Sequence, residues 1–203
     1  MRLQLLSGFA VLVCVLSVRA EDKPEAKLDL FPLSKGMKWE YEVSVAGQTK
    51  DVVQEVTKVT PGKKGERAIA TLTTKIETQI ITEDMSTDDK AIYRHAFNGV
   101  TLETPLTIVK YPFKAGSTWK ETIKIGQEEA LAKFDTSKSE EVKVAAGKYT
   151  AYPVIMEMET MGQKVSSKNW YADGVGMVKQ EVDFGGMKIT MELKKFTKAK
   201  KDD

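Results

Sequence analysis

The chain has little of what enzymes and metal proteins most often use. Its 203 residues include one cysteine, Cys14, and one histidine, His95. Cys14 lies in an N-terminal segment that we expect to be removed, so the mature chain has no disulfide, thiolate nucleophile or cysteine-based zinc or iron–sulfur site. Its asparagines, Asn98 and Asn169, begin no Asn-x-Ser/Thr sequon, which favours a bacterial envelope over a glycosylating secretory route.

An excess of charge of one sign is also absent. The sequence has 31 basic and 29 acidic residues, and removal of Arg2 and Arg19 with the N-terminal segment leaves the two signs balanced. A neutral chain lacks the positive field that attracts nucleic acid, so we expect no nucleic-acid partner. Beyond residue 20 no apolar run approaches the roughly 20 residues of a membrane span, so we expect a chain that does not span a membrane.

Residues 1–20 have the order of a cleavable signal peptide. Arg2 supplies a positive charge, an apolar stretch follows, and Val18 and Ala20 are small residues at the −3 and −1 positions of the cleavage site. The alternatives are a membrane anchor or a lipidated Cys14. The run is too short for a span, and the cysteine lacks the small residue that should precede it. We expect export to the periplasm or the extracellular space.

The remaining chain predicts one domain with charged ends. Residues 21–30 are charged and contain a proline, so we expect a mobile leader. Residues 31–196 form a single β-rich domain, and residues 197–203 a charged tail. Lysines of the tail are candidates for contact with anionic lipid or wall polymer, although a frayed, solvated end is the more common role of such a run.

Alternation of apolar and polar residues predicts strands throughout the domain. The clearest run has apolar side chains at every second position from Met187 to Leu193, which places them on one face of a strand. Asn98-Gly99 and Gly185-Gly186 are typical of two-residue hairpin turns. We therefore predict an all-β fold, a curved antiparallel sheet that is half-barrel or barrel-like.

An internal repeat divides this domain. Phe31-Pro32-Leu33, Gly36 and Trp39 recur 80 residues later as Tyr111-Pro112-Phe113, Gly116 and Trp119. Each copy places a proline and a glycine before a strand that begins near a tryptophan. We predict two related β-meander halves, at about 31–103 and 111–196, with both tryptophans in the interior.

One motif resembles a known family. Residues 170–179, WYADGVGMVK, follow the aromatic-Pro segment near residue 31 and the VKVAAGKY segment at 142–149. The three segments together resemble uncharacterised exported bacterial domains with a WYAxGVGxVK strand–turn–strand motif. These are similar to the curved sheets that carry lipoproteins across the periplasm. The resemblance implies the fold and brings no catalytic residue.

Candidate reactive groups have simpler structural interpretations. No Gly-x-Ser-x-Gly elbow accompanies His95, and we interpret this histidine as structural, on one strand face with Tyr93 and Phe97. The acidic stretch 83–89 supplies carboxylates that suit calcium but lacks the pattern of an EF-hand, so we expect a solvated loop. We therefore predict no enzyme activity, no catalytic residue, no metal and no cofactor.

Methionines are the least ordinary feature. Met156 and Met158 share a strand face and Met161 follows, and clustered thioethers suit Cu(I). The alternative is an adaptable apolar lining, since methionine fills irregular gaps. We favour a lining, and we list the predicted ligand-lining residues as Trp39, Tyr41, Met156, Met158, Met187 and Met191.

These observations predict a non-enzymatic envelope protein that binds an apolar or amphipathic ligand or assists envelope assembly. The expected partners are a lipid or other apolar molecule and, as a second class, another envelope protein. A structural module with a filled interior is the alternative, and copper binding is third. The first two differ in whether the inward side chains line a void or pack against one another.

Overall fold

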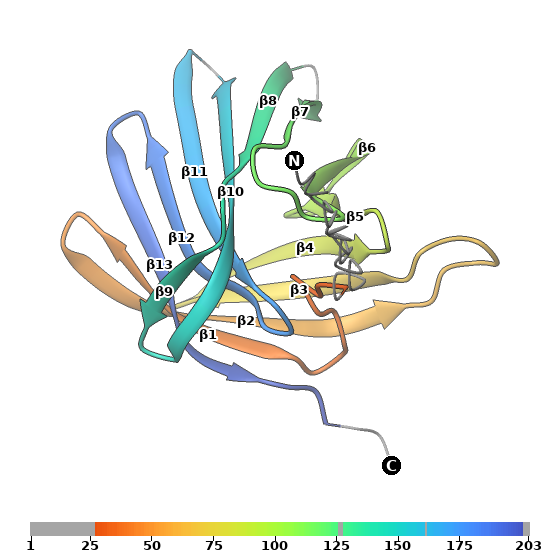
Figure 1. The fold of residues 1–203 in the computed structure, drawn as a ribbon, viewed down its shortest axis with the longest axis horizontal. Coiled ribbons are helices and arrows are strands. Elements are labelled where there is room, and N and C mark those ends of the chain that lie inside the picture. Colours follow the sequence, from red (N-terminus) through yellow and green to blue (C-terminus); the bar gives the residue numbers. More distant parts are fainter. Residues whose placement is uncertain (1–26, 126–127, 161, 201–203) are drawn as a thin grey trace, which may run out of the picture.

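The protein is an all-β structure, as the sequence predicts. The computed structural model describes residues 27–125, 128–160 and 162–200, and in these ranges it has thirteen strands and no helix (Figure 1). The strands are β1 (Lys38–Val45), β2 (Gln48–Thr60), β3 (Ile69–Ile76), β4 (Gln79–Thr87), β5 (Ala91–Phe97), β6 (Val100–Lys110), β7 (Thr118–Ile125), β8 (Glu128–Thr136), β9 (Glu140–Val144), β10 (Gly147–Thr160), β11 (Gln163–Ala172), β12 (Gly176–Phe184) and β13 (Met187–Thr197).

All the strand pairs of this sheet are antiparallel, and the sheet nearly closes on itself. Its order is β6-β5-β4-β3-β2-β1-β13-β12-β11-β10-β8-β7, with β9 paired to β10. The pairing of β1 with β13 joins the two ends of the chain, and we call it the closed junction. At the other side β6 lies beside β7 as the two ends of the strand order, and we call this place the seam. The predicted barrel-like sheet is therefore confirmed.

Two hairpin turns have the backbone that their sequences predict. Asn98 and Gly99 join β5 to β6 with φ of 48° and 81°, and Gly185 and Gly186 join β12 to β13 with φ of 58° and 95°. A two-residue turn with positive φ at both positions matches the twist of antiparallel strands. Glycine and asparagine tolerate this backbone better than other residues.

Two backbone hydrogen bonds recur at the 80-residue spacing of the predicted repeat. Gly36 donates its N–H to the Val56 carbonyl at 2.8 Å, and Gly116 donates to the Thr136 carbonyl at 2.7 Å. Donor and acceptor are each displaced by the predicted 80 residues. Trp39 and Trp119 follow within β1 and β7 and are 0% and 7% exposed. The prediction that both tryptophans belong to strands and are buried is confirmed.

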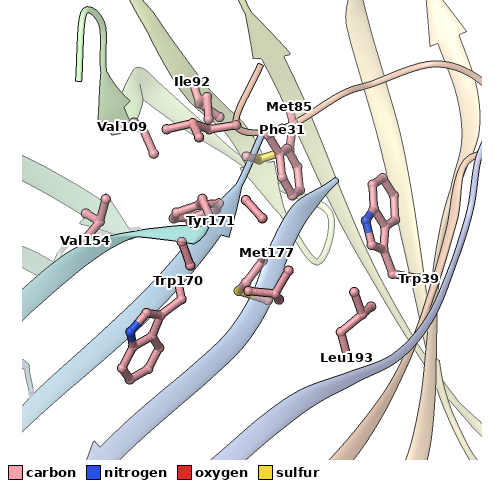
Figure 2. Close-up of a cluster of buried hydrophobic side chains, with 14 of the residues drawn as sticks. Phe31, Trp39, Met85, Ile92, Val109, Val154, Trp170, Tyr171, Met177 and Leu193 are labelled. Atoms are coloured by element: carbon pink, nitrogen blue, oxygen red, sulfur yellow. The ribbon is translucent and has the colours of Figure 1, made fainter. Parts of the chain in front are cut away.

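An aromatic cluster fills one end of the sheet. Phe31 stacks on Trp39 with ring centroids 5.7 Å apart, and Trp39 stacks on Phe196 at 5.6 Å. The Trp39 indole N–H donates to the Val175 carbonyl at 2.6 Å, which satisfies its one polar atom inside the core. Figure 2 shows Phe31 and Trp39 in this core, with Tyr171 and Met177 near them. Phe31, which precedes the first strand, is thus part of the core.

The packed domain begins earlier than the sequence predicts. Leu30 was assigned to a mobile leader, yet its side chain is fully buried and its N–H donates to the Tyr111 hydroxyl at 3.1 Å. Asp29 accepts a hydrogen bond from the Gly174 N–H at 2.8 Å. The expected signal peptide and residues 21–26 of the leader lie outside the described residues. Within the described ranges no helix has the length and apolar character needed to cross a membrane.

Candidate functional site

A cavity of about 360 Å³ lies inside the curved sheet. Most of its lining side chains are apolar, and strands from both halves contribute them. Small-molecule sites in proteins have volumes of roughly 300–1,000 Å³ and are mostly apolar. The volume and the lining therefore fall within the range of a ligand site.

The structure separates the six predicted lining residues into three groups. Tyr41, Met156, Met158 and Met191 lie on the cavity wall. Trp39 is buried in the aromatic cluster and does not line the cavity. Met187 was assigned wrongly: it is the first residue of β13, directly after the turn, and is 48% exposed. The alternating pattern continues past the part of the strand that borders the cavity.

Strand pairing explains why the methionines share one wall. Met156 pairs with Ser167 and Met158 with Val165 across β10 and β11. Residues two apart on a strand, and residues directly opposite in a neighbouring strand, have side chains on the same face of the sheet. All four side chains line the cavity, so this wall is continuous across the two strands.

Aromatic side chains border the buried end of the cavity, and its rim is exposed. Phe31, Tyr171 and Met177 border it at the core, and the Tyr41 hydroxyl donates to the Met177 carbonyl at 2.9 Å. Burial raises the pKa of Tyr41 and of Tyr171 well above the ordinary value, so both phenols are neutral. Phe97 also borders the cavity and is 45% exposed, so it forms part of the exposed rim.

Polar side chains that the sequence analysis did not single out lie on the same wall. Glu83 and Arg94 form an ion pair of 2.7 Å, and Gln54 donates to Glu83 at 3.4 Å. The interpretation of residues 83–89 as a solvated loop was wrong, because Glu83–Thr87 belong to β4. Ile81, Glu83 and Met85 stand at every second position of β4, and all three line the cavity. This alternation is the sequence pattern that could have identified Glu83 as a lining residue.

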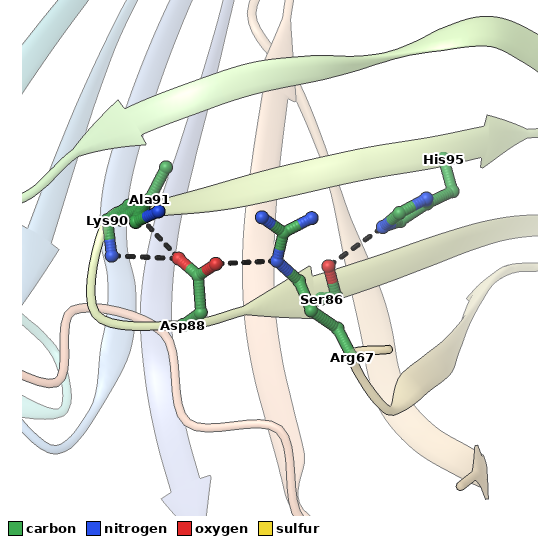
Figure 3. Close-up of polar contacts among 6 residues, drawn as sticks. All are labelled: Arg67, Ser86, Asp88, Lys90, Ala91 and His95. Atoms are coloured by element: carbon green, nitrogen blue, oxygen red, sulfur yellow. Dashed lines mark hydrogen bonds and ion pairs between the residues drawn. The ribbon is translucent and has the colours of Figure 1, made fainter. Parts of the chain in front are cut away.

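His95 makes a hydrogen bond that its sequence context did not predict. Its Nε2 lies 2.8 Å from the Ser86 Oγ (Figure 3), and neither residue lines the cavity. Phe97 does line it, so the expectation that His95 shares a face with Phe97 was wrong. Burial, with the nearby Arg67 guanidinium, lowers the pKa of His95 and favours the neutral ring. Ser86 is 0% exposed, which withdraws its hydroxyl from any substrate.

Acidic groups near this pair have partners within the protein. Asp88 accepts hydrogen bonds from the N–H groups of Lys90 and Ala91, at 2.8 and 2.9 Å, and from Arg67 at 2.6 Å (Figure 3). These contacts fix the turn between β4 and β5. In the part of the chain that the structure describes, no group of three or more His, Cys, Asp or Glu side chains is placed to hold a metal ion.

The copper hypothesis depends on three methionines, of which two are described. Met156 and Met158 line the cavity, and Met161 lies outside the described residues. The wall position of the first two agrees with the adaptable lining that methionine provides.

Comparison with known proteins supports the fold. Residues 120–191 match the model of the DUF3108-like family. A candidate lipoprotein from Parabacteroides distasonis has a similar structure, with a TM-score of 0.54, 15% identity, and coverage of 84% of this chain and 99% of that chain. A candidate exported protein with a YmcC-like fold from Bacteroides fragilis gives 0.56 and 16%, with coverage of 83% and 98%. No curated protein matches the sequence.

Proposed function

We propose that the protein is an exported, non-enzymatic binding protein that holds an apolar or amphipathic molecule inside its curved sheet. The observation that carries this proposal is the cavity of about 360 Å³ with a mostly apolar lining. A structural module would fill this space with inward side chains. The cavity favours a binding role over that alternative.

The composition of the wall supports an amphipathic ligand. Met156, Met158 and Met191 offer flexible thioethers that adapt to chains of different shape. Ser167 and Gln54 add hydrogen-bonding groups on the same surface. A ligand with an apolar chain and a polar group matches both kinds of surface. A purely polar metabolite would make no favourable apolar contact with the thioethers.

Export is supported by the sequence of the first 20 residues. The Val18-x-Ala20 cleavage pattern follows a short apolar run. The two similar structures are named as a candidate lipoprotein and a candidate exported protein. A carrier or assembly role in the bacterial envelope fits this location, and lipids are the abundant amphipaths there.

A pair of methionine variants tests the binding proposal. The fluorescent probe N-phenyl-1-naphthylamine reports an apolar site by its increase in emission. Met158→Lys places a charge on the cavity wall, so we expect at least a tenfold weaker apparent affinity for the probe. Met187→Lys is the matched control, because Met187 is exposed outside the cavity, and it should bind as the unmodified protein does.

Thermal unfolding of both variants distinguishes loss of the site from loss of the fold. The proposal requires Met158→Lys to unfold cooperatively and still lose probe binding. Absence of probe binding by the unmodified protein, or equal binding by the two variants, would contradict it.

A further inference from the structure

The cavity contains a connected set of polar side chains on neighbouring strands. Gln54 of β2 donates from its Nε2 to the Thr74 Oγ1 at 3.1 Å and to a Glu83 carboxylate oxygen at 3.4 Å. Arg94 of β5 forms an ion pair of 2.7 Å with the other oxygen of Glu83. All four side chains line the cavity, and we call them the polar band.

A second set of polar side chains comes from β11 and β12. Gln180 donates from Nε2 to the Asn169 Oδ1 at 2.6 Å, and Asn169 donates from Nδ2 to the Ser167 Oγ at 3.2 Å. Ser167 and Asn169 are only 8% and 9% exposed. These groups carry no charge, so they offer a ligand hydrogen bonds alone.

The charges of the cavity compensate each other. Among the described residues, Glu83 and Arg94 are the charged side chains on its wall, and they contact each other directly. Their side chains are only 14% and 32% exposed, so solvent screens them weakly. An anionic head group that approached Arg94 would also approach Glu83, and a cationic one that approached Glu83 would meet Arg94.

Arg94 nevertheless has donor capacity left. Its Nε is a buried polar atom that has no hydrogen-bond partner among the described residues. Its guanidinium lies over the Phe97 ring, 5.6 Å from the centroid, at the exposed rim of the cavity. A neutral oxygen accepts such a donor without bringing a second negative charge close to Glu83.

We infer that the ligand is a neutral amphipath: a single apolar chain with an uncharged hydroxyl or ester head group. The head group contacts Arg94 and Gln54 of the polar band, and the chain lies along Met156 and Met158. This inference rests on the proposed function, because it names the ligand class for the same cavity. It excludes a free fatty acid or an alkylamine as the preferred ligand.

Three ligands with the same chain and different head-group charge test the inference. Each is measured by displacement of N-phenyl-1-naphthylamine below its micelle concentration: 1-monododecanoylglycerol (neutral), dodecanoate (negative) and dodecylammonium (positive). We expect the neutral ligand to displace the probe at a concentration at least tenfold lower than either charged ligand. A preference for dodecanoate or dodecylammonium, or no preference, would overturn the inference.

A charge variant provides the second test. Glu83→Gln keeps the size of the side chain and leaves Arg94 as an uncompensated cation, so dodecanoate should bind at least tenfold more tightly than it does to the unmodified protein. Glu103→Gln is the control, because Glu103 pairs with Lys124 and does not line the cavity, and it should change nothing. An unchanged affinity for dodecanoate in a folded Glu83→Gln variant would contradict the inference.

The two proposals fail in different ways. If the probe itself does not bind, the proposed function is wrong. If the probe binds but the three head groups compete equally, only the assignment of a neutral head group is wrong. The ranking on the unmodified protein needs no variant, so the inference remains testable if Glu83→Gln does not fold.

Discussion

The two halves of the sheet meet at two junctions, which differ in how they are held. At the closed junction β1 and β13 pair from Lys38↔Thr197 to Val45↔Ile189, with one irregularity between Glu40 and Tyr41. At the seam, a side-chain hydrogen bond and an ion pair connect β6 to β7. The Trp119 indole donates to the Thr107 carbonyl at 3.1 Å, and Lys124 pairs with Glu103 at 3.7 Å.

The sequence of β6 explains this difference. Arg94 pairs with Leu106 and Ala96 with Thr101, so residues 102–105 stand opposite His95 alone. Such a bulge bends the strand, and Pro105 within it has no N–H to donate. The repeat therefore places the same turn and tryptophan in each half. Whether a junction forms a regular ladder depends on the strand that pairs there, which is β13 at the closed junction and β6 at the seam.

Substitution of the two tryptophans should change the free energy of unfolding by different amounts. Trp39→Ala removes a fully buried ring at the closed junction and should lower the free energy of unfolding by about 3–5 kcal/mol. Trp119→Ala at the seam should cost at least about 1 kcal/mol less, because an irregular junction relaxes more easily around the lost volume. Urea unfolding of both variants measures the difference, and equal losses would contradict the comparison.

Hydrogen exchange compares the junctions without substitution. Backbone amides of β1 that pair with β13 should exchange only through extensive unfolding. Amides of β6 near the bulge should exchange roughly 100-fold faster, through local opening of the seam. Exchange measured by NMR at neutral pH tests this, and uniform protection around the sheet would show that the seam is as stable as the closed junction.

The lowered pKa of His95 predicts that the stability of the sheet near the seam depends on pH. Burial and Arg67 lower the pKa of His95, so the unfolded chain binds a proton more readily than the folded one. Stability is therefore fully present above the unfolded pKa of about 6.5 and falls as the pH drops below it. Because the backbone of His95 lies opposite the bulge of β6, amides of β5 and β6 should be the first to lose protection from hydrogen exchange. His95→Gln should remove this part of the pH dependence, and a persistent difference at the seam would contradict the assignment.

The smallest expected effect concerns the ion pair across the seam. Glu103 and Lys124 have side chains that are 73% and 48% exposed, so solvent and salt screen their attraction. Glu103→Gln should change the free energy of unfolding by less than about 0.5 kcal/mol. A larger loss in a urea titration would mean that the seam depends on this pair.

Local features of the fold could be predicted from the sequence, because they depend on neighbouring residues. The Asn98-Gly99 and Gly185-Gly186 turns and the predicted strands appear in the structure, and the hydrogen bonds of Gly36 and Gly116 recur 80 residues apart. Such signals need only a preferred backbone or a period of two. The pattern also placed Tyr41 and Met156 correctly on an inward face.

The features that the sequence did not predict depend on residues far apart in the chain. Glu83 lies in an acidic stretch that suggests a loop, and its partner Arg94 becomes adjacent only through the pairing of β4 with β5. Met187 continues an apolar pattern, and only the extent of the cavity shows that it lies outside. The volume of the cavity depends on the curvature of the whole sheet, which no single segment determines.

Native mass spectrometry shows whether the cavity holds an amphipathic ligand in the cell. The protein should be purified from its own envelope without detergent exchange and measured before and after organic extraction. We expect an extractable bound mass with one apolar chain and an uncharged head group, lost in Met158→Lys and retained in Met187→Lys. An apo mass throughout, from protein that also fails to bind N-phenyl-1-naphthylamine, would contradict it.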